Sequence, residues 1–381
     1  MKIKLSTKKI ALLLICAGCV FMLSQCNKSN FYDEFVVCPI VHYVPYAPYV
    51  PAAPPLSDHS SIAFIARTTY NSSDWSLYIM DKLGNNMRRL VNKSVACRAP
   101  IRSHCGTKLA FSTGTDLYLI YTDGTGLTLL DRNAGNMSWS PCERFIIYVR
   151  WCDTDSNNTH LIRYCIVSNT RAIWPTKGNV CNVQFSPCGR YIAYCATIET
   201  SMIPFHNHNI YIMDINGRYS RLIIKNAGTP RWSPQGDRIA YLSSGKENSS
   251  QIFVANADGS NQKQLTHTIS SHIWPGSWGA DGNRDPQWTP DGERIVYVSW
   301  GNERPEVFIM NADGSNQTRL TTAELRDEDP EITPDGNFIL FASSRIRTET
   351  GTVTPAIYSM TLDGKDIRQL SQTGIHPVAL R

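Results

Sequence analysis

Two loops of the chain hold the residues best suited to contact a ligand. One insertion, residues 267–284, places His272, Trp274 and Trp278 in a stretch rich in Gly and Ser. Tryptophan is enriched at binding hot spots, because its ring buries a large apolar surface and still donates a hydrogen bond. A second loop holds Phe205. We expect these four residues to contact a protein or a glycan; alternatively, the tryptophans fold back and cap the domain.

Histidines are the side chains that could hold a metal ion. His206 and His208 lie two residues apart, so in a strand both imidazoles would share one face. His267 and Asp281 flank the insertion that contains His272. No third ligand is evident beside the first pair, and histidines in loops are usually solvated. We therefore expect no metal site and no cofactor.

Catalytic motifs are missing from the sequence. A serine hydrolase of the α/β class needs a Gly-x-Ser-x-Gly elbow, and the chain contains none. The Asn-Ala-Asp-Gly-Ser-Asn runs at 256–261 and 311–316 have some features of calcium loops but lack the closing Glu, so hairpin turns are expected there. A binding protein without catalytic activity is the expectation.

The chain repeats itself from residue 60 onward. Asn-Ala-Asp-Gly-Ser-Asn-Gln occurs identically at 256–262 and 311–317, and Trp-Ser-Pro-Gln-Gly at 232–236 parallels Trp-Thr-Pro-Asp-Gly at 288–292. Asp-Gly between apolar strands predicts a hairpin, because Gly readily takes a positive φ. Each unit therefore predicts four short antiparallel strands.

Each repeat unit has one aromatic residue in each of its two middle strands, so these residues count the units. The second strands hold Phe64, Phe111, Tyr148, Tyr194, Tyr241, Tyr297 and Phe341, and the third strands hold Tyr78, Tyr118, Tyr164, Tyr211, Phe253, Phe308 and Tyr358. Seven four-stranded units predict an all-β fold, a seven-bladed β-propeller over residues 61–381. A six-bladed ring would require the unit at 97–131 to be misassigned. The first unit lacks an opening strand, and residues 376–380 are expected to supply it and close the ring.

This repeat resembles the propeller of the TolB family. The likeness rests on Trp-Ser-Pro-x-Gly-x-x-Ile-Ala-Tyr at 232–241 and Met-x-x-Asp-Gly-x-x-x-x-x-Leu at 310–320, and it is strongest in the last four units. The resemblance implies an envelope protein of the Tol–Pal type that binds a protein partner, possessing a six-bladed ring behind a globular domain. Here seven units follow a Pro/Tyr-rich stretch, so a TolB-like scaffold with a peptidoglycan-associated partner is expected.

A second resemblance is to oligogalacturonate lyase, a seven-bladed propeller with a histidine-ligated metal. It implies, as the alternative, a glycan-binding or carbohydrate-active propeller that uses loop tryptophans and axial polar groups. An acidic axial cluster with paired histidines would favour this alternative. A polar axis without a metal would favour the protein-binding scaffold.

Residues 1–26 are expected to form an export signal. Four lysines precede an unbroken apolar run, residues 10–23, which is shorter than the roughly 20 residues of a transmembrane helix. Cys19 follows Ala-Gly and Cys26 follows Leu-Ser-Gln, and both resemble the lipidation motif of bacterial lipoproteins. We expect a protein in the periplasm, or anchored to the outer membrane by a lipid on one of these cysteines; the alternative is an ordinary signal peptide.

Residues 27–60 differ in composition from the repeats. Prolines and tyrosines each recur there with a spacing of three, the period of polyproline II helix. Such a segment is extended and stiff. We expect a linker that holds the propeller away from a membrane; alternatively, its tyrosines form a docking strip.

Nine cysteines follow residue 26, and none lies beyond Cys195. In an exported protein, disulfides are the expected use of such cysteines. A turn at 186–189 would place Cys181 opposite Cys195. Cys142 and Cys188 occupy the same turn position in successive units, so they are expected to pair if those turns approach each other.

The charge balance argues against nucleic acid as a partner. The chain has 37 Lys and Arg against 32 Asp and Glu, but four of the lysines lie within the first nine residues. The remainder is nearly neutral, whereas a nucleic-acid surface is strongly basic.

Overall fold

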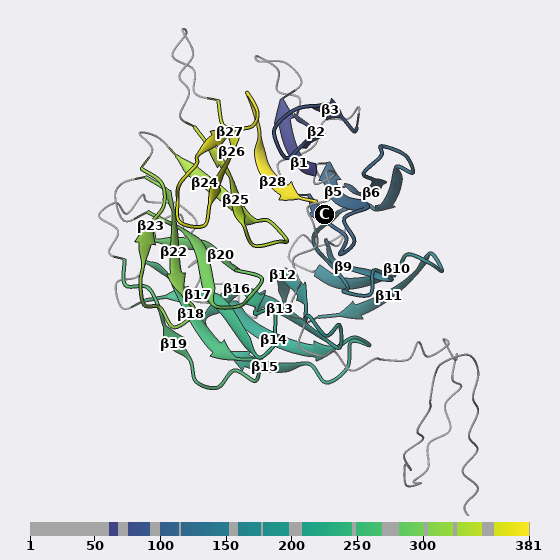
Figure 1. Cartoon of the computed structure of the whole chain (residues 1–381). Coiled ribbons are helices and arrows are strands. Elements are labelled where there is room, and N and C mark those ends of the chain that lie inside the picture. The colour runs from purple at the N-terminus through teal and green to yellow at the C-terminus, as the bar shows by residue number, and fades with distance from the viewer. Residues whose placement is uncertain are drawn as a thin grey trace, which may run out of the picture. The chain divides into compact units, whose positions relative to one another are not determined.

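Figure 1 shows the computed structural model of the chain. The structure describes residues 61–67, 75–91, 100–113, 116–151, 159–176, 178–197, 208–245, 249–268, 282–300, 304–322, 326–344 and 354–380. The expected signal peptide, Cys19, Cys26 and the linker lie outside these ranges. The chain divides into two units after Ala52, and all the described residues belong to the second. In the described ranges all regular elements are strands, and none of them contains a helix of the length and apolarity that a membrane span requires.

The strands form seven antiparallel sheets of four. Those next to the ring axis are β28 (Ile375–Ala379), β4 (Ile101–Arg102), β8 (Ala134–Trp139), β12 (Asn179–Phe185), β16 (Ala227–Trp232), β20 (Asn283–Trp288) and β24 (Asp327–Ile332). The second strands are β1 (Ser61–Arg67), β5 (Lys108–Thr113), β9 (Phe145–Trp151), β13 (Tyr191–Thr197), β17 (Arg238–Ser244), β21 (Arg294–Ser299) and β25 (Phe338–Ser343). The third strands are β2 (Trp75–Asp81), β6 (Asp116–Tyr121), β10 (Thr159–Cys165), β14 (His208–Asp214), β18 (Ser250–Asn256), β22 (Glu306–Asn311) and β26 (Ala356–Thr361). The outer strands are β3 (Arg88–Arg89), β7 (Thr128–Asp131), β11 (Thr170–Pro175), β15 (Arg221–Ile224), β19 (Lys263–Gln264), β23 (Thr318–Arg319) and β27 (Arg368–Gln369).

These sheets are the blades of a seven-bladed β-propeller, as the repeats predict. Blade 1 holds β28 with β1–β3, and blades 2 to 7 hold β4–β7, β8–β11, β12–β15, β16–β19, β20–β23 and β24–β27. The innermost strands of successive blades contact one another around the ring (Figure 1). The unit at 97–131, on which a six-bladed alternative depended, forms the complete blade 2.

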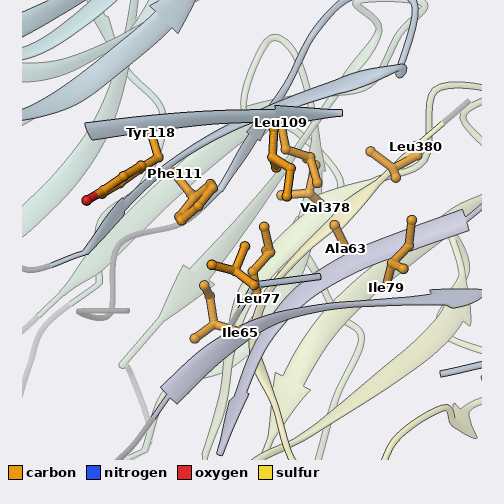
Figure 2. Close-up of a cluster of buried hydrophobic side chains, with 11 residues drawn as sticks. Ala63, Ile65, Leu77, Ile79, Leu109, Phe111, Tyr118, Val378 and Leu380 are labelled. Carbon is orange, nitrogen blue, oxygen red and sulfur yellow. The ribbon is translucent and has the colours of Figure 1, made fainter. Parts of the chain in front are cut away.

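The C-terminal strand closes the ring. β28 pairs antiparallel with β1, with Ala63 opposite Val378 and Ile65 opposite Ile375. Figure 2 shows Val378 and Leu380 packed in one apolar cluster with side chains of blades 1 and 2, among them Leu77 and Leu109. Residues from the two ends of the described chain thus share a sheet and a core, which confirms the predicted closure.

Each blade is apolar on both faces because it packs between two neighbours. In β9 the side chains of Ile146 and Tyr148 belong to a buried cluster shared with blade 2. The alternating residues Ile147 and Val149 belong to a different cluster, shared with blade 4. Successive side chains of a strand point to opposite faces, so a sheet buried on both sides needs apolar residues at consecutive positions.

The marker aromatics form cross-strand stacks in six of the seven blades. Their ring centroids lie between 5.4 Å, for Tyr194 and Tyr211, and 5.9 Å, for Phe64 and Tyr78. Blade 3 departs from the expectation, because the register places Ile162 rather than Tyr164 opposite Tyr148. The Tyr148 hydroxyl instead donates a 2.7 Å hydrogen bond to Asp131 of blade 2.

The two ends of the blades differ. In a four-stranded antiparallel meander, the tight turns after the first and third strands lie at one end, which we call the turn face. The connections after the second and fourth strands lie at the other end, which we call the loop face. The segments 198–207 and 269–281, which contain Phe205, His272, Trp274 and Trp278, lie outside the described residues. The described strands that precede and follow both segments end at the loop face.

Candidate functional site around the ring axis

A β-bulge interrupts the innermost strand of six blades at one equivalent position, and the bulged residue has a positive φ. These residues are Asn136 (φ 47°), Asn182 (43°), Thr229 (51°), Asp285 (53°), Asp329 (53°) and His376 (50°). The register shifts at all six places. Asn and Asp tolerate this left-handed backbone, whereas a β-branched Thr is a true outlier. All six side chains are polar, although apolar residues occupy most of the neighbouring strands.

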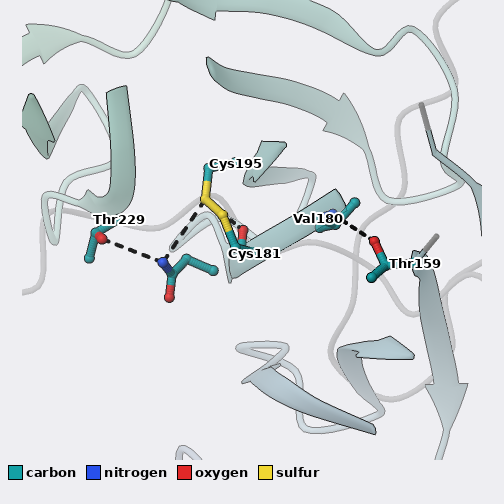
Figure 3. Close-up of a disulfide and its surroundings, with 6 residues drawn as sticks. Thr159, Val180, Cys181, Cys195 and Thr229 are labelled. Atoms are coloured by element: carbon teal, nitrogen blue, oxygen red, sulfur yellow. Dashed lines mark hydrogen bonds between the residues drawn. A yellow bond between two sulfur atoms is a disulfide. The ribbon is translucent and has the colours of Figure 1, made fainter. Parts of the chain in front are cut away.

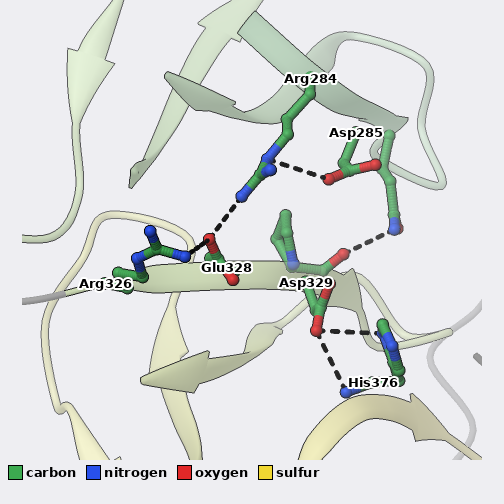
Figure 4. Close-up of polar contacts among 8 residues, drawn as sticks. Arg284, Asp285, Arg326, Glu328, Asp329 and His376 are labelled. Carbon is green, nitrogen blue, oxygen red and sulfur yellow. Dashed lines mark hydrogen bonds and ion pairs between the residues drawn. The ribbon is translucent and has the colours of Figure 1, made fainter. Parts of the chain in front are cut away.

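Bulged residues of neighbouring blades contact each other across the blade boundaries. The Asn182 amide donates to the Thr229 hydroxyl over 3.4 Å. Figure 4 shows Asp329 of blade 7 beside His376 of the closing strand, with Asp329 Oδ2 3.0 Å from His376 Nδ1 and 3.3 Å from its backbone N. The bulges therefore form a polar axial ring, and the closing strand contributes the only imidazole among its described members.

Charged groups of blades 6 and 7 surround Asp285 at this ring (Figure 4). Arg284 lies 3.7 Å from Asp285 and 2.5 Å from Glu328, and Arg326 lies 3.8 Å from the same Glu328. Enclosure by protein raises the pKa of the Asp285 carboxyl, although Arg284 opposes this and 43% of the side chain is still exposed. The neighbouring Asp329 carboxylate raises this pKa further.

The pKa of Asp329 is shifted in the opposite direction to that of Asp285. Burial on its own would raise the pKa of its carboxyl, but the hydrogen bond and the charge of His376 outweigh burial and lower the pKa. Two equivalent carboxyls in adjacent blades thus differ in protonation behaviour, because only one of them faces the imidazole.

A second set of polar side chains lies two residues further along the same strands. Burial raises the pKa of the Glu331 carboxyl, opposed by Arg102, Gln287 and Arg231. Burial also lowers the pKa of the Arg231 guanidinium, opposed by Asp285 and Glu331. Both signs of charge therefore occur around the axis, an arrangement suited to a polar or charged ligand group rather than an apolar one.

A buried hydrogen-bond network holds both ends of the segment that contains the predicted tryptophans. The side-chain oxygen of Gln251, Oε1, accepts from the Thr268 backbone N over 3.1 Å and from Asn283 Nδ2 over 3.0 Å. Asn283 Nδ2 also lies 3.0 Å from the Thr266 hydroxyl. Thr268 precedes the segment 269–281 and Asn283 follows it, so the network joins the two described residues that flank it at the loop face.

Sequence reasoning missed these positions. Gln251 and Asn283 are fully buried polar residues in otherwise apolar strands, and their only signal is that they interrupt the apolar pattern. The axial ring was also missed. Its signal, a recurring polar residue before proline in Thr229-Pro, Asp285-Pro, Asp329-Pro and His376-Pro, is present in the sequence.

The cysteines pair in one of the two expected ways. Cys181 and Cys195 lie opposite each other in β12 and β13 and form a disulfide (Figure 3). The expected Cys142–Cys188 disulfide is wrong, because both thiols are free and exposed. Their turns do approach, but Pro141 faces the backbone of Gly189, and each thiol lies beside a serine of its own turn.

Metal ligands were the other chemistry that the histidines suggested. Among the residues that the structure describes, no three His, Cys, Asp or Glu side chains gather closely enough to hold an ion. His208 begins β14, opposite Thr197, and His206 lies outside the described ranges.

Comparison with known proteins agrees with the repeat. Residues 281–379 match the model of the TolB beta propeller domain. An uncharacterized protein of Agrobacterium fabrum is 27% identical over 141 residues, which are 37% of this chain and 42% of that protein. The Tol-Pal system protein TolB of Thioalkalivibrio sulfidiphilus is 31% identical over 88 residues, 22% of this chain and 18% of that protein. The matches thus span less than half of these relatives.

The solved structures share the fold. An oligogalacturonate lyase in complex with manganese superposes with a TM-score of 0.56 at 17% identity, over 82% of this chain and 85% of that one. Identity this low shows the architecture alone. Together, the seven blades, the matched domain model and the repeat motifs show a seven-bladed β-propeller whose repeats resemble those of TolB.

Proposed function

We propose that the protein is an exported, non-catalytic scaffold of the bacterial cell envelope that binds a protein partner at its loop face, over the axial ring. The single observation that carries this proposal is the ring itself, six polar side chains held at bulged, left-handed positions around one axis. Asn, Asp and His take a positive φ readily, but it strains the β-branched Thr229, and strained backbone clusters at functional sites. The six polar side chains also stand out because most other strand positions are apolar.

Two features support a protein as the ligand. The axial charges are of both signs, with Asp285, Asp329 and Glu331 against Arg231 and His376, so a folded partner or a peptide of mixed charge could pair with them. The Gln251 network fixes both ends of the tryptophan-containing segment at the same face. Trp274, Trp278, His272 and Phe205 would then contact the partner from the rim.

The relatives suggest the class of partner and the cellular location. One relative is a Tol-Pal system protein, which supports an envelope location and a peptidoglycan-associated partner. We assign residues 1–26 to the export signal, 27–60 to a spacer and 61–381 to the propeller. Cys19 or Cys26 would carry a lipid that anchors the chain to the membrane. Metabolic labelling with a lipid precursor should then be lost in Cys19→Ala or in Cys26→Ala, and persistence in the double variant would contradict anchoring.

Site-specific photo-crosslinking tests the binding face. A photoreactive amino acid at position 205 or 274 should form adducts with a purified peptidoglycan-associated protein, whereas the same group at the exposed turn-face position Asn316 should not. Trp274→Ala with Trp278→Ala should weaken binding at least about tenfold. Adducts of equal yield from all three positions, or none from 205 and 274, would refute the loop face as the binding site.

A glycan is the second candidate ligand. Its supporting observation is an acid–imidazole pair, Asp329 and His376, at the axis of a fold shared with an oligogalacturonate lyase. If this candidate holds, oligogalacturonate should raise the melting temperature, and His376→Gln should abolish the rise. An unchanged melting temperature with oligogalacturonate, with or without Mn²⁺, would contradict it.

A further inference from the structure

We propose that the outer rim of blades 3 and 4 binds an acidic, extended segment of a partner protein, which adds as a strand along β11. This surface is the perimeter of the ring, so the inference goes beyond the loop-face site proposed above. Three observations carry it: the length of an edge strand, the apolar side chains beside it, and the charge of the two blades.

The outer strand of blade 3 is unusually long. β11 has six residues, the outer strands of blades 2 and 4 have four each, and those of blades 1, 5, 6 and 7 have two. Within the described chain β11 pairs only with β10, so its other edge faces outward. An unpaired edge of this length is a template for an added strand, and proteins usually keep such edges short.

Apolar side chains are exposed beside this edge. Ile173 of β11 is 55% exposed and lies opposite Ile162, on the face toward blade 2. Leu222 of β15, in blade 4, is 39% exposed. Leu222 lies opposite Tyr211 in the sheet. The equivalent outer-strand residues, opposite Phe253, Phe308 and Tyr358, are Gln264, Arg319 and Gln369. The repeat thus places a polar residue here in blades 5 to 7 and leucine in blade 4.

A second apolar surface lies on the opposite face of β11, at the boundary between blades 3 and 4. The Trp174 ring of β11 packs directly over Gly217 in the turn before β15. Two residues further, Tyr219 is 83% exposed and has a φ of 56°. Asn261 and Asn316 occupy this left-handed position in blades 5 and 6. A bulky residue at such a position is an outlier, and at this exposure burial does not compensate for it.

The charge of these blades selects an acidic ligand. Between residues 134 and 224 the described basic residues are Arg144, Arg150, Arg163, Arg171, Arg190, Arg218 and Arg221, against the acids Glu143 and Asp214. Of these arginines, Arg171 is paired with Asp131 of blade 2 at 3.7 Å. Both acids bond within the protein, Glu143 to Cys105 and Asp214 to the amides of its own turn. The same surplus of arginine argues against a second copy of this chain, because two such rims would repel each other.

Selection from a random peptide library displayed on phage tests the inference. The purified protein should enrich sequences in which Asp or Glu alternates with aliphatic residues. Binding of a selected peptide should weaken at least about tenfold in Ile173→Lys and in Leu222→Lys, and be unchanged in Gln264→Lys, the matched position in blade 5. Arg221→Glu should weaken binding in low salt, whereas Thr318→Glu, the matched position in blade 6, should not.

Several results would overturn the proposal. Selected peptides without acidic residues would do so, as would peptides that bind Leu222→Lys and Gln264→Lys equally. So would a concentration-dependent dimer that Leu222→Lys abolishes, or binding of anionic vesicles in place of peptide. An unchanged melting temperature shows that each variant is folded. Photo-crosslinking at positions 205 and 274 is independent of these variants, so failure here and failure of the loop-face proposal are separable.

Discussion

Blades 3 and 4 differ from blades 6 and 7, although all four have the same strand order. Blades 6 and 7 hold the repeat in its regular form, with Thr-Pro-Asp-Gly turns, stacked aromatic pairs and two-residue outer strands. Blades 3 and 4 contain the free Cys142 and Cys188, the Cys181–Cys195 disulfide, a turn in which Glu143 replaces Gly, and longer outer strands.

The difference separates what the fold requires from what it tolerates. Every blade must be apolar on both faces, and blades 3 and 4 obey this rule as strictly as the others. Most of their departures from the repeat lie at turns and outer edges, where packing imposes little; the exceptions are the Cys181–Cys195 disulfide between β12 and β13 and Ile162 opposite Tyr148 in blade 3. Features that cost free energy there, such as Tyr219 at positive φ, are therefore not explained by packing, and they are the ones on which the proposed rim site rests.

Truncation of a core aromatic should have the largest effect. Phe341 in blade 7 is fully buried and stacks on Tyr358 at 5.7 Å. Phe341→Ala should lower the free energy of unfolding by about 4 kcal/mol, because it removes a large apolar side chain and leaves a cavity. Urea unfolding followed by tryptophan fluorescence measures this loss. A loss below about 1 kcal/mol would mean that the regular blades are not held by these stacks.

Removal of the disulfide should come next. Cys181 and Cys195 are 14 residues apart, so the double change Cys181→Ala with Cys195→Ala should lower the free energy of unfolding by about 3 kcal/mol, as the unfolded chain regains entropy. Cys142→Ala with Cys188→Ala is the matched control from the same two blades and should change little. Equal losses in the two double variants would contradict the observed pairing.

Loss of one hydroxyl distinguishes blade 3 from blade 6. Tyr148→Phe removes a 2.7 Å hydrogen bond to the Asp131 carboxylate and should cost about 2 kcal/mol, since hydrogen bonds to charged groups are the stronger ones. Tyr297→Phe removes a 3.2 Å bond to the neutral Gln317 side chain and should cost about 1 kcal/mol. Denaturation midpoints of the two variants measure this, and that of Tyr148→Phe should be the lower. The opposite order would contradict the greater strength of the hydrogen bond to the carboxylate.

A turn substitution should have a smaller effect. Gly336 in blade 7 has a φ of 72°, so Gly336→Ala should cost about 1 kcal/mol of stability. Glu143 occupies the equivalent position in blade 3, with a φ of 58°, and its carboxylate accepts a 3.0 Å hydrogen bond from the Cys105 thiol. Glu143→Ala adds no backbone strain, so its cost should come from the contact with Cys105. Restoration of the lost stability by Glu143→Gln, measured by thermal unfolding, would support that assignment; a full loss in both would contradict it.

The smallest effects should depend on pH, because water screens the axial carboxyls. The lowered pKa of Asp329 means that this group stabilises the fold above pH about 4, its unfolded value, and that the contribution is lost as the pH falls through the native value. The raised pKa of Asp285 has the opposite sign, so its ionised form destabilises the fold at neutral pH. At pH 7, Asp329→Asn should lower the urea midpoint and Asp285→Asn should raise it. Midpoints that move in the same direction would contradict the contrast.

Much of the architecture was predictable because the repeat is local. The spacing of Phe64, Phe111 and their equivalents numbers the blades, and the missing first strand predicts the closure by residues 376–380. The Cys181–Cys195 pair follows from one turn and its register. Tyr164 shows the limit of prediction from the spacing of aromatic residues. A shift of two residues in β10 places Ile162 opposite Tyr148, and the spacing does not reveal this shift.

The strand order, the number of blades and the closure of the ring follow from the sequence, because hairpin turns and alternating strand faces are set by residues close together in the chain. Which side chains meet at the axis depends instead on how distant strands come together. Asp329 and His376 are 47 residues apart, and a bulge in each strand turns them toward one another. The tertiary structure also decides that Cys142 and Cys188 stay apart, because the stagger of neighbouring turns depends on how the blades pack.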